Sequence, residues 1–138
     1  MSSKAIHTDQ APKAIGPYSQ AVRAGDTVYL AGQIPLDPAT MQMVEGDFGK
    51  EAERVFENIK AVIAAAGGSF SQVVKVTIFL TDIKNNTKVW KARAEVFSGN
   101  FPASTMPLIL PKICLAWSYS SMPASTLGSV PRAVMPET

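Results

Sequence analysis

The sequence predicts an α+β domain in which a layer of helices packs on one face of a mixed β-sheet. Two segments repeat apolar residues at intervals of three and four, which is typical of amphipathic helices. Short β-branched and apolar runs alternate with these helices, and turns containing glycine or proline separate them. The expected element order is therefore β-β-α-β-α-β-β.

The first expected elements form a β-hairpin. Thr27–Gly32 is rich in β-branched and aromatic residues and follows the turn pair Gly25-Asp26, so we expect it to pair with Ser19–Arg23. The following segment, Gly32–Pro38, is punctuated by glycine and proline and is predicted to be a loop.

A long helix is predicted to begin at Asp47, whose side chain can cap the first turn. Gly67-Gly68 should end it, because glycine adopts the left-handed conformation common after a helix. One face of this helix should be buried, and its apolar positions are Ala52, Val55, Phe56, Ile59, Val62, Ile63 and Ala66.

The next predicted elements are a central strand over Val73–Leu80, a turn over Asp82–Asn86 and a second helix over Thr87–Phe97. The inward positions of the second helix should be Val89, Ala92, Val96 and Phe97.

The last third of the chain has an unusual composition. No carboxylate side chain lies between Glu95 and Glu137, and six of the ten prolines follow Asn100. Leu108–Leu110 is a short apolar run, and Ile113–Tyr119 alternates with a period of two, as a half-buried strand does. We expect one domain over residues 1–122, which suits the length of 138, and a loose tail over 123–138.

Composition excludes several classes of function. The net charge is only +2 and no basic run occurs, so we expect no nucleic-acid partner. No window approaches 18 apolar residues and Met1–Lys13 lacks an apolar stretch, so we expect neither a membrane span nor a signal peptide. Cys114 and His7 are single, which fits a reducing cytoplasm and argues against a disulfide, a zinc site or a Cys-His nucleophile.

Two motifs carry a family resemblance. Ala11–Gln20 reads APKAIGPYSQ, and Ala31–Pro38 reads AGQIPLDP. Together with the helix ending AAGG, the strand VVKVTIFLTDI and the FPA of Phe101–Ala103, they cover about three quarters of the chain. In these residues the chain closely resembles the RidA family, also called the YjgF or reactive-intermediate deaminase family.

The resemblance implies a chorismate-mutase-like α+β fold and a homotrimer with active sites in the clefts between subunits. It also implies a 2-iminobutanoate/2-iminopropanoate deaminase, which hydrolyses reactive 2-imino and enamine acids to 2-keto acids and ammonia. The implied ligands are small 2-imino and 2-keto acids, and the implied reaction uses no metal or organic cofactor.

The resemblance also implies site residues. Tyr18 matches the tyrosine that forms a pocket wall, although its ring could simply pack and its hydroxyl find a partner. Gly32 matches the glycine whose backbone approaches the ligand, although it could merely end a strand. Ala31 stands where the family usually has serine. Trp90 stands where many members have asparagine, and a buried aromatic there would fill space instead of accepting a hydrogen bond.

Two central groups of the resembled site are replaced. Where the family has FPAR, Ser104 takes the place of the arginine that clamps the substrate carboxylate. If Leu110–Lys112 matches the family's LPK, the position of the water-orienting glutamate falls on Trp117. Losing a buried charge partner commonly costs several kcal/mol, on the order of a thousandfold in binding. We therefore expect ordinary imine deamination to be very weak.

Alternatives remain for both the function and the tail. Besides a deaminase, the chain could be a non-catalytic trimer that binds small metabolites or a protein, or, less favoured, a translation inhibitor or ribonuclease. The composition after Ala103 fits a shift of reading frame near that codon, which is our leading hypothesis. Two other hypotheses remain. The chain could be a genuine paralogue with a repurposed pocket, or the alignment past Ala103 could be wrong.

Overall fold

A computed structural model describes residues 2–106 of the chain. The described elements, in chain order, are β1 (Ser3–Ile6), β2 (Ala21–Ala24), β3 (Thr27–Leu30), α1 (Phe48–Ala65), β4 (Lys75–Thr77), α2 (Asn86–Val96) and β5 (Ala103–Thr105). Short 3-10 turns, Phe70–Gln72 and Ile83–Asn85, precede β4 and α2. The chain is thus α+β, as the sequence predicts.

The first three strands form an antiparallel sheet in the order β1-β2-β3. Ala24 pairs with Thr27, and the two residues between them are the Gly25-Asp26 turn of the predicted hairpin. Gly25 has a φ of 59°, as the first central position of a type II′ hairpin turn requires. β1 was not expected; it pairs with β2 along the outer edge and its residues Ser3–Ala5 are exposed.

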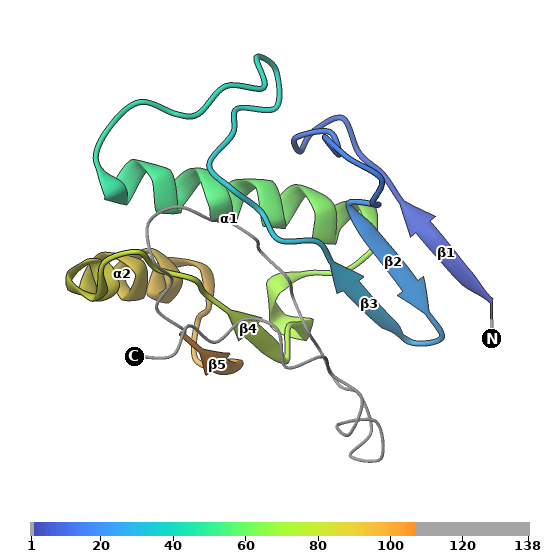
Figure 1. Cartoon of the computed structure of the whole chain (residues 1–138). Coiled ribbons are helices and arrows are strands. Elements are labelled where there is room, and N and C mark those ends of the chain that lie inside the picture. Colours follow the sequence, from blue (N-terminus) through green and yellow to red (C-terminus); the bar gives the residue numbers. More distant parts are fainter. Residues whose placement is uncertain (1, 107–138) are drawn as a thin grey trace, which may run out of the picture.

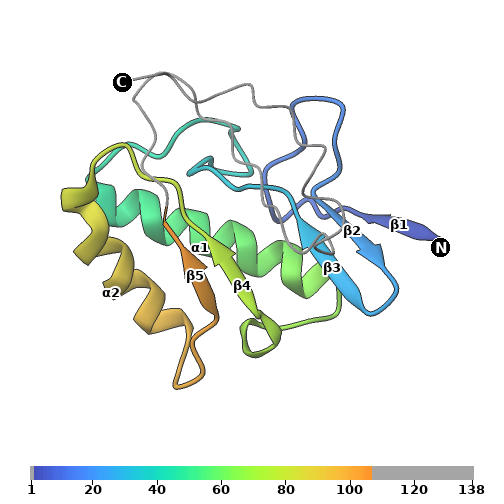
Figure 2. The ribbon, with the colours of Figure 1, turned by 60° about the horizontal axis from the view of Figure 1, so that its bottom comes forward.

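β4 and β5 form a separate parallel pair in which Val76 lies opposite Ser104. β4 is shorter than the predicted strand over Val73–Leu80, and Val74 just before it is 80% exposed. Within residues 2–106 the strands therefore form two sheets instead of the one expected. Figure 2 shows that β3, β4 and β5 are arranged in this order from one side of the molecule to the other.

α1 begins and ends at the predicted signals. The Asp47 side chain accepts a hydrogen bond from the Lys50 N–H at 3.1 Å, which caps the first turn. At the other end the Gly68 N–H donates to the Ile63 carbonyl at 3.0 Å and the Gly67 N–H donates to the Ala64 carbonyl at 2.9 Å. With Gly67 at a φ of 80°, these two bonds form a Schellman motif.

The two helices pack beside each other and against the strands (Figure 1). One core cluster lies between α1, α2 and β4: Ala52, Phe56, Ala92 and Phe97, with Phe48, Phe70, Val73, Val76 and Val96 against it. Phe70 contacts Phe56 and Phe97 edge-on, with ring centroids 6.5 and 5.2 Å away. A second cluster joins α1 to the antiparallel sheet: Ala11, Ala21 and Val62, with Ile6, Val28, Leu30 and Ala61.

Some predictions fall outside the described residues. These are the run Leu108–Leu110, the alternating segment Ile113–Tyr119 and the tail over 123–138, all of which lie beyond residue 106. The domain boundary at 122 and the trimer stay predictions. Within residues 2–106, neither helix combines the length and apolarity needed to cross a membrane.

Candidate functional site

Tyr18 and Gly32 line the same pocket, although 14 positions separate them in the sequence. The other residues around this pocket, which we call the Tyr18 pocket, are Pro12, Lys13, Ile15, Gln20, Gln33, Ile34 and Leu36. Both motifs of the family resemblance therefore contribute to one surface. That surface is the candidate site.

Tyr18 is held by local hydrogen bonds and remains partly open to solvent. Its N–H donates to the Gly16 carbonyl at 2.8 Å, and its hydroxyl accepts from the Ile15 N–H at 3.3 Å. The side chain is 47% exposed. The Tyr18 hydroxyl therefore has a partner and the residue lines the pocket, while its role toward a ligand stays a prediction.

Gln20 fixes one side of the Tyr18 pocket. Its residue is 3% exposed, and its side-chain amide donates to the carbonyl oxygens of Ala11 and Pro12 at 3.3 and 2.8 Å. Its backbone carbonyl accepts from the Ala31 N–H at 2.9 Å, just before Gly32. Gln20 therefore joins the two motifs, and its role was not foreseen from the sequence.

Asn58 fixes the other side of the Tyr18 pocket. It is fully buried on α1, and its side-chain amide donates to the carbonyl oxygens of Ile34 and Leu36 at 3.2 and 2.9 Å. The sequence held a signal, since Asn58 lies three residues after Val55 and four before Val62, on the apolar face. A buried polar side chain at such a position requires hydrogen-bond partners.

The Tyr18 pocket is small. Its free volume is about 20 Å³, enough for about one water molecule but not for an organic acid. The described residues of one chain therefore supply walls of a site and not an enclosed cavity. A ligand would need further walls or a displacement of these residues.

Ser104 and Trp90 do not line the Tyr18 pocket. Ser104 is exposed on β5, opposite Val76. Trp90 is 57% exposed on α2, so the burial that we considered for this aromatic is wrong for the single chain. Ala31 is half-buried and follows β3 directly. Trp117, the position matched to the family glutamate, lies outside the described residues.

Each of the three arginines in residues 2–106 already contacts another group of the fold, which bears on the clamp that the family resemblance implies. The Arg93 guanidinium donates to the Pro102 carbonyl at 2.8 Å and lies 6.0 and 5.8 Å from the Phe97 and Phe101 ring centroids. Arg54 pairs with Glu57 at 3.0 Å, and Arg23 donates to the Ala66 carbonyl. Each of the three is thus engaged within the fold.

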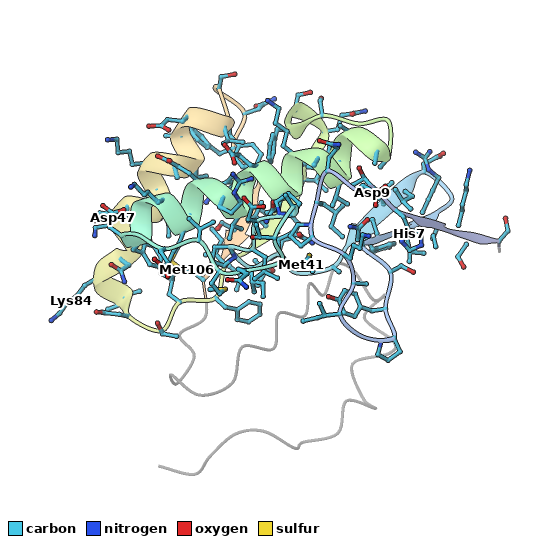
Figure 3. The ribbon with its side chains drawn as sticks, turned by 90° about the horizontal axis from the view of Figure 1, so that it is seen from above. His7, Asp9, Met41, Asp47, Lys84 and Met106 are labelled. Atoms are coloured by element: carbon cyan, nitrogen blue, oxygen red, sulfur yellow. The ribbon has the colours of Figure 1, made fainter. Side chains whose placement is uncertain are left out.

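The described residues gather no three His, Cys, Asp or Glu side chains that could hold a metal ion. The pKa of the Asp47 carboxyl is shifted, and Asp47 does not line the Tyr18 pocket. The Lys50 N–H bonded to Asp47 at the start of α1 lowers the pKa of that carboxyl below its ordinary value of 3.8. Figure 3 labels Asp47 at the end of the molecule opposite His7 and Asp9.

Comparison with known proteins identifies the class. The family model described as Endoribonuclease L-PSP, which represents the RidA/YjgF proteins, matches residues 8–108. Protein DfrA of Myxococcus xanthus is 60% identical over 105 residues, which cover 75% of this chain and 80% of the relative. The human 2-iminobutanoate/2-iminopropanoate deaminase is 43% identical over 100 residues, which cover 72% and 73%.

Solved structures agree. RidA from Psychrobacter sp. PAMC 21119 is 46% identical, with a TM-score of 0.75, and the match covers 79% of this chain and 89% of that chain. E. coli TdcF with bound serine is 35% identical, with a TM-score of 0.74 and the same coverage of 79% and 89%. The chain belongs to the RidA/YjgF family and has that family's fold.

Proposed function

We propose that this chain binds small 2-imino and 2-keto acids at the Tyr18 pocket and hydrolyses the imino acids to keto acids and ammonia at a strongly reduced rate. The observation that carries the proposal is that Tyr18 and Gly32, from separate motifs, line one pocket. Relatives named 2-iminobutanoate/2-iminopropanoate deaminase match this chain at 43% to 46% identity. Their name describes the reaction that we transfer here.

The proposed reaction needs water and no further reactant. The water oxygen bonds to the imine carbon, and the nitrogen takes up a proton to give a tetrahedral amino alcohol. The carbon–nitrogen bond then breaks, the hydroxyl loses its proton, and the products are a 2-keto acid and ammonia. In this scheme Tyr18 walls the substrate, and the backbone at Gly32 approaches it closely because no side chain intervenes.

Ser104 does not line the Tyr18 pocket of its own chain, so in our proposal the clamp position comes from a neighbouring subunit of the trimer, and the reduced rate follows from the serine at that position. A serine hydroxyl offers one donor and no charge, whereas arginine offers a planar cationic fork that suits a carboxylate. Arg93 is committed to the Pro102 carbonyl, so it does not substitute within the described residues. The loss is several kcal/mol, or on the order of a thousandfold.

We also propose that the active assembly is a homotrimer in the cytoplasm. The small free volume of the Tyr18 pocket, about 20 Å³, supports completion of the site by a neighbouring subunit. Size-exclusion chromatography with light scattering measures the mass directly. A mass of one chain would contradict the trimer.

A coupled assay tests the activity. Threonine dehydratase with threonine generates the imino acid, and 2-keto acid formation is followed with and without this protein. We expect a weak acceleration over spontaneous hydrolysis. Tyr18→Ala is the sharper probe, because Tyr18→Phe would keep the aromatic wall of the pocket. Tyr29→Ala on β3, outside the pocket, is the matched control. Equal rates for wild type and Tyr18→Ala would contradict the assigned pocket.

Binding without turnover is the second candidate, and the exposed, uncharged Ser104 favours it. Its signature is thermal stabilisation by 2-ketobutyrate without any acceleration in the coupled assay. RNA cleavage, which the description of the family model names, is not what we propose. Intact RNA after incubation with protein purified through high salt is the expected result.

A further inference from the structure

An exposed turn connects α2 to β5, the strand that carries Ser104. Residues 98–101 of this turn are exposed, and Gly99 among them has a φ of 95°, in the left-handed region. Pro102 follows and is buried directly before β5. Figure 2 shows the chain leaving α2 and returning beside β4 as β5. The position of Ser104 therefore depends on how this turn is held.

Arg93 of α2 holds both ends of the turn. Its backbone carbonyl accepts from the Phe97 N–H at 2.9 Å, which closes α2. Its guanidinium donates to the Pro102 carbonyl at 2.8 Å. Proline has no N–H, so the carbonyl is the one main-chain group through which Pro102 can be hydrogen-bonded. A single residue thus joins the end of α2 to the start of β5.

Two aromatic rings lie beside the Arg93 guanidinium. Its central carbon is 6.0 Å from the ring centroid of Phe97, which is buried, and 5.8 Å from that of Phe101, which is exposed. A planar guanidinium stacks on aromatic faces and donates in a fixed fork, and an ammonium group does neither. Within residues 2–106 the one ion pair joins Arg54 and Glu57, so Arg93 has no carboxylate partner in that part of the chain.

β5 is short and has few main-chain contacts of its own. It spans three residues, and β4 is its one neighbour within the described residues. The Ala103 N–H donates to the Val74 carbonyl at 3.1 Å, and Ser104 lies opposite Val76 in this register. The Arg93 contact acts on the residue just before this first ladder bond. It is therefore well placed to set the register of β5.

We propose that Arg93 is a positioning residue for the substrate site. Through the Pro102 carbonyl it sets where the side chain at position 104 is presented to the Tyr18 pocket of a neighbouring subunit. The inference rests on the proposed function, in which position 104 faces the substrate carboxylate. Arg93 itself touches no substrate in this scheme.

The first test asks whether the gain from Ser104→Arg requires Arg93. In the coupled assay Ser104→Arg should raise kcat/KM about tenfold or more, chiefly by lowering KM, because the new arginine binds the substrate carboxylate. In the Arg93→Met background the same change should gain no more than about twofold. Arg54→Met, which removes the pair with Glu57, is the matched control and should keep the full gain. An equal gain with and without Arg93 would overturn the proposal.

This comparison separates positioning from general stability. Each gain is a ratio of two proteins that share the same residue 93, so a loss of folded protein common to both cancels. A purely structural role would lower the rates without removing the effect of Ser104→Arg on KM. Arg93→Lys is a milder second variant, since it keeps the charge without the planar fork, and it should reduce the gain in the same direction.

Amide hydrogen exchange tests the contact without any activity. In Arg93→Met the Ala103 N–H should exchange at least about tenfold faster than in wild type. The Thr8 N–H, which is bonded to Gln20, should keep its wild-type rate and so report that the rest of the fold is intact. Arg54→Met should change neither rate.

The two experiments distinguish a failure of this inference from a failure of the proposed function. Unchanged exchange of the Ala103 N–H in Arg93→Met would show that Arg93 does not position β5, whatever the activity assay gives. Faster exchange, together with no gain from Ser104→Arg in the wild-type background, would refute the proposed clamp and with it the role of Arg93 toward substrate.

Discussion

Gln20 and Thr8 are paired in both directions, since the Thr8 N–H donates to the side-chain carbonyl of Gln20 at 2.7 Å and the amide nitrogen donates back to the Thr8 carbonyl at 3.0 Å. The pairing resembles one step of a β-ladder made by a side chain. It also borders the Tyr18 pocket, which Gln20 lines.

Replacing Gln20 should destabilise the fold. Gln20→Ala leaves the Thr8 N–H and the Ala11 and Pro12 carbonyls without their partner, and Ala11 and Pro12 are buried. Each buried polar group without a partner costs about 1–3 kcal/mol, so we expect a loss of about 2–4 kcal/mol. Urea unfolding measures it. Gln42→Ala, at an exposed position, is the control, and equal midpoints for the two variants would contradict the prediction.

Asn58→Asp should be more damaging than its small size suggests. The change replaces an amide donor with a carboxylate oxygen that faces the Ile34 and Leu36 carbonyls at a fully buried site. We expect a loss of about 3–5 kcal/mol at neutral pH, the usual cost of an unpaired buried charge.

The deficit of Asn58→Asp should shrink in acid. Burial raises the pKa of the new carboxyl in the folded state, so protonation favours folding and restores one donor. Urea midpoints at several pH values test both statements. Asn100→Asp, the same change at an exposed position, should cost little. A deficit for Asn58→Asp that does not vary with pH would rule out this explanation.

Asp47 should contribute stability that disappears in acid. Its pKa is lowered mainly by the Lys50 N–H, so the folded state favours the carboxylate. The contribution is present above the ordinary pKa of 3.8 and is lost as the pH falls through the lower folded value. Asp47→Asn keeps a capping oxygen but does not titrate. The difference in urea midpoint between wild type and Asp47→Asn should therefore change below about pH 4 and be constant above it.

Ser104→Arg should raise deaminase activity if the proposed function is right. A cationic fork on β5 restores the charge-assisted clamp, and we expect an increase of about tenfold or more in the coupled assay. The double variant with Trp117→Glu should exceed it, since that change restores the water-orienting carboxylate. Ser98→Arg, also exposed, controls for added charge. Normal activity in wild type, with no gain from Ser104→Arg, would contradict the importance of the missing arginine.

The sequence predicted the elements that depend on local signals. Asp47 caps α1 and Gly67 ends it, and the Gly25-Asp26 pair forms the hairpin turn. β1 was missed because its four residues SKAI show no clear alternation and lie at an edge. The strand predicted over Val73–Leu80 was too long at both ends, since β4 spans Lys75–Thr77. At the first end, apolar content alone does not show that Val74 stays exposed.

The candidate site was only partly predictable. The motif resemblance named Tyr18 and Gly32, and the fold brings them to one pocket. Gln20 was missed because its carbonyl partners are backbone groups 8 or more positions away, which no residue type marks. The place of Asn58 on the apolar face of its helix signals a buried amide, but the sequence does not name its partner 24 positions away. The expectations for Ser104 and Trp117 stay predictions, since Ser104 does not line the Tyr18 pocket and Trp117 lies outside the described residues.

The hydrogen-bonded pairing of β4 with β5 has a consequence for how the amino-acid sequence of β5 can vary. The Ala103 N–H donates to the Val74 carbonyl at 3.1 Å and the Ile78 N–H donates to the Thr105 carbonyl at 2.9 Å. These are main-chain contacts, which any residue except proline can make. The main-chain pairing of β5 with β4 therefore does not depend on which side chain other than proline stands at Ser104. A change of side chain at the exposed Ser104 can therefore alter what this position offers to a ligand or a partner while the main-chain pairing with β4 remains.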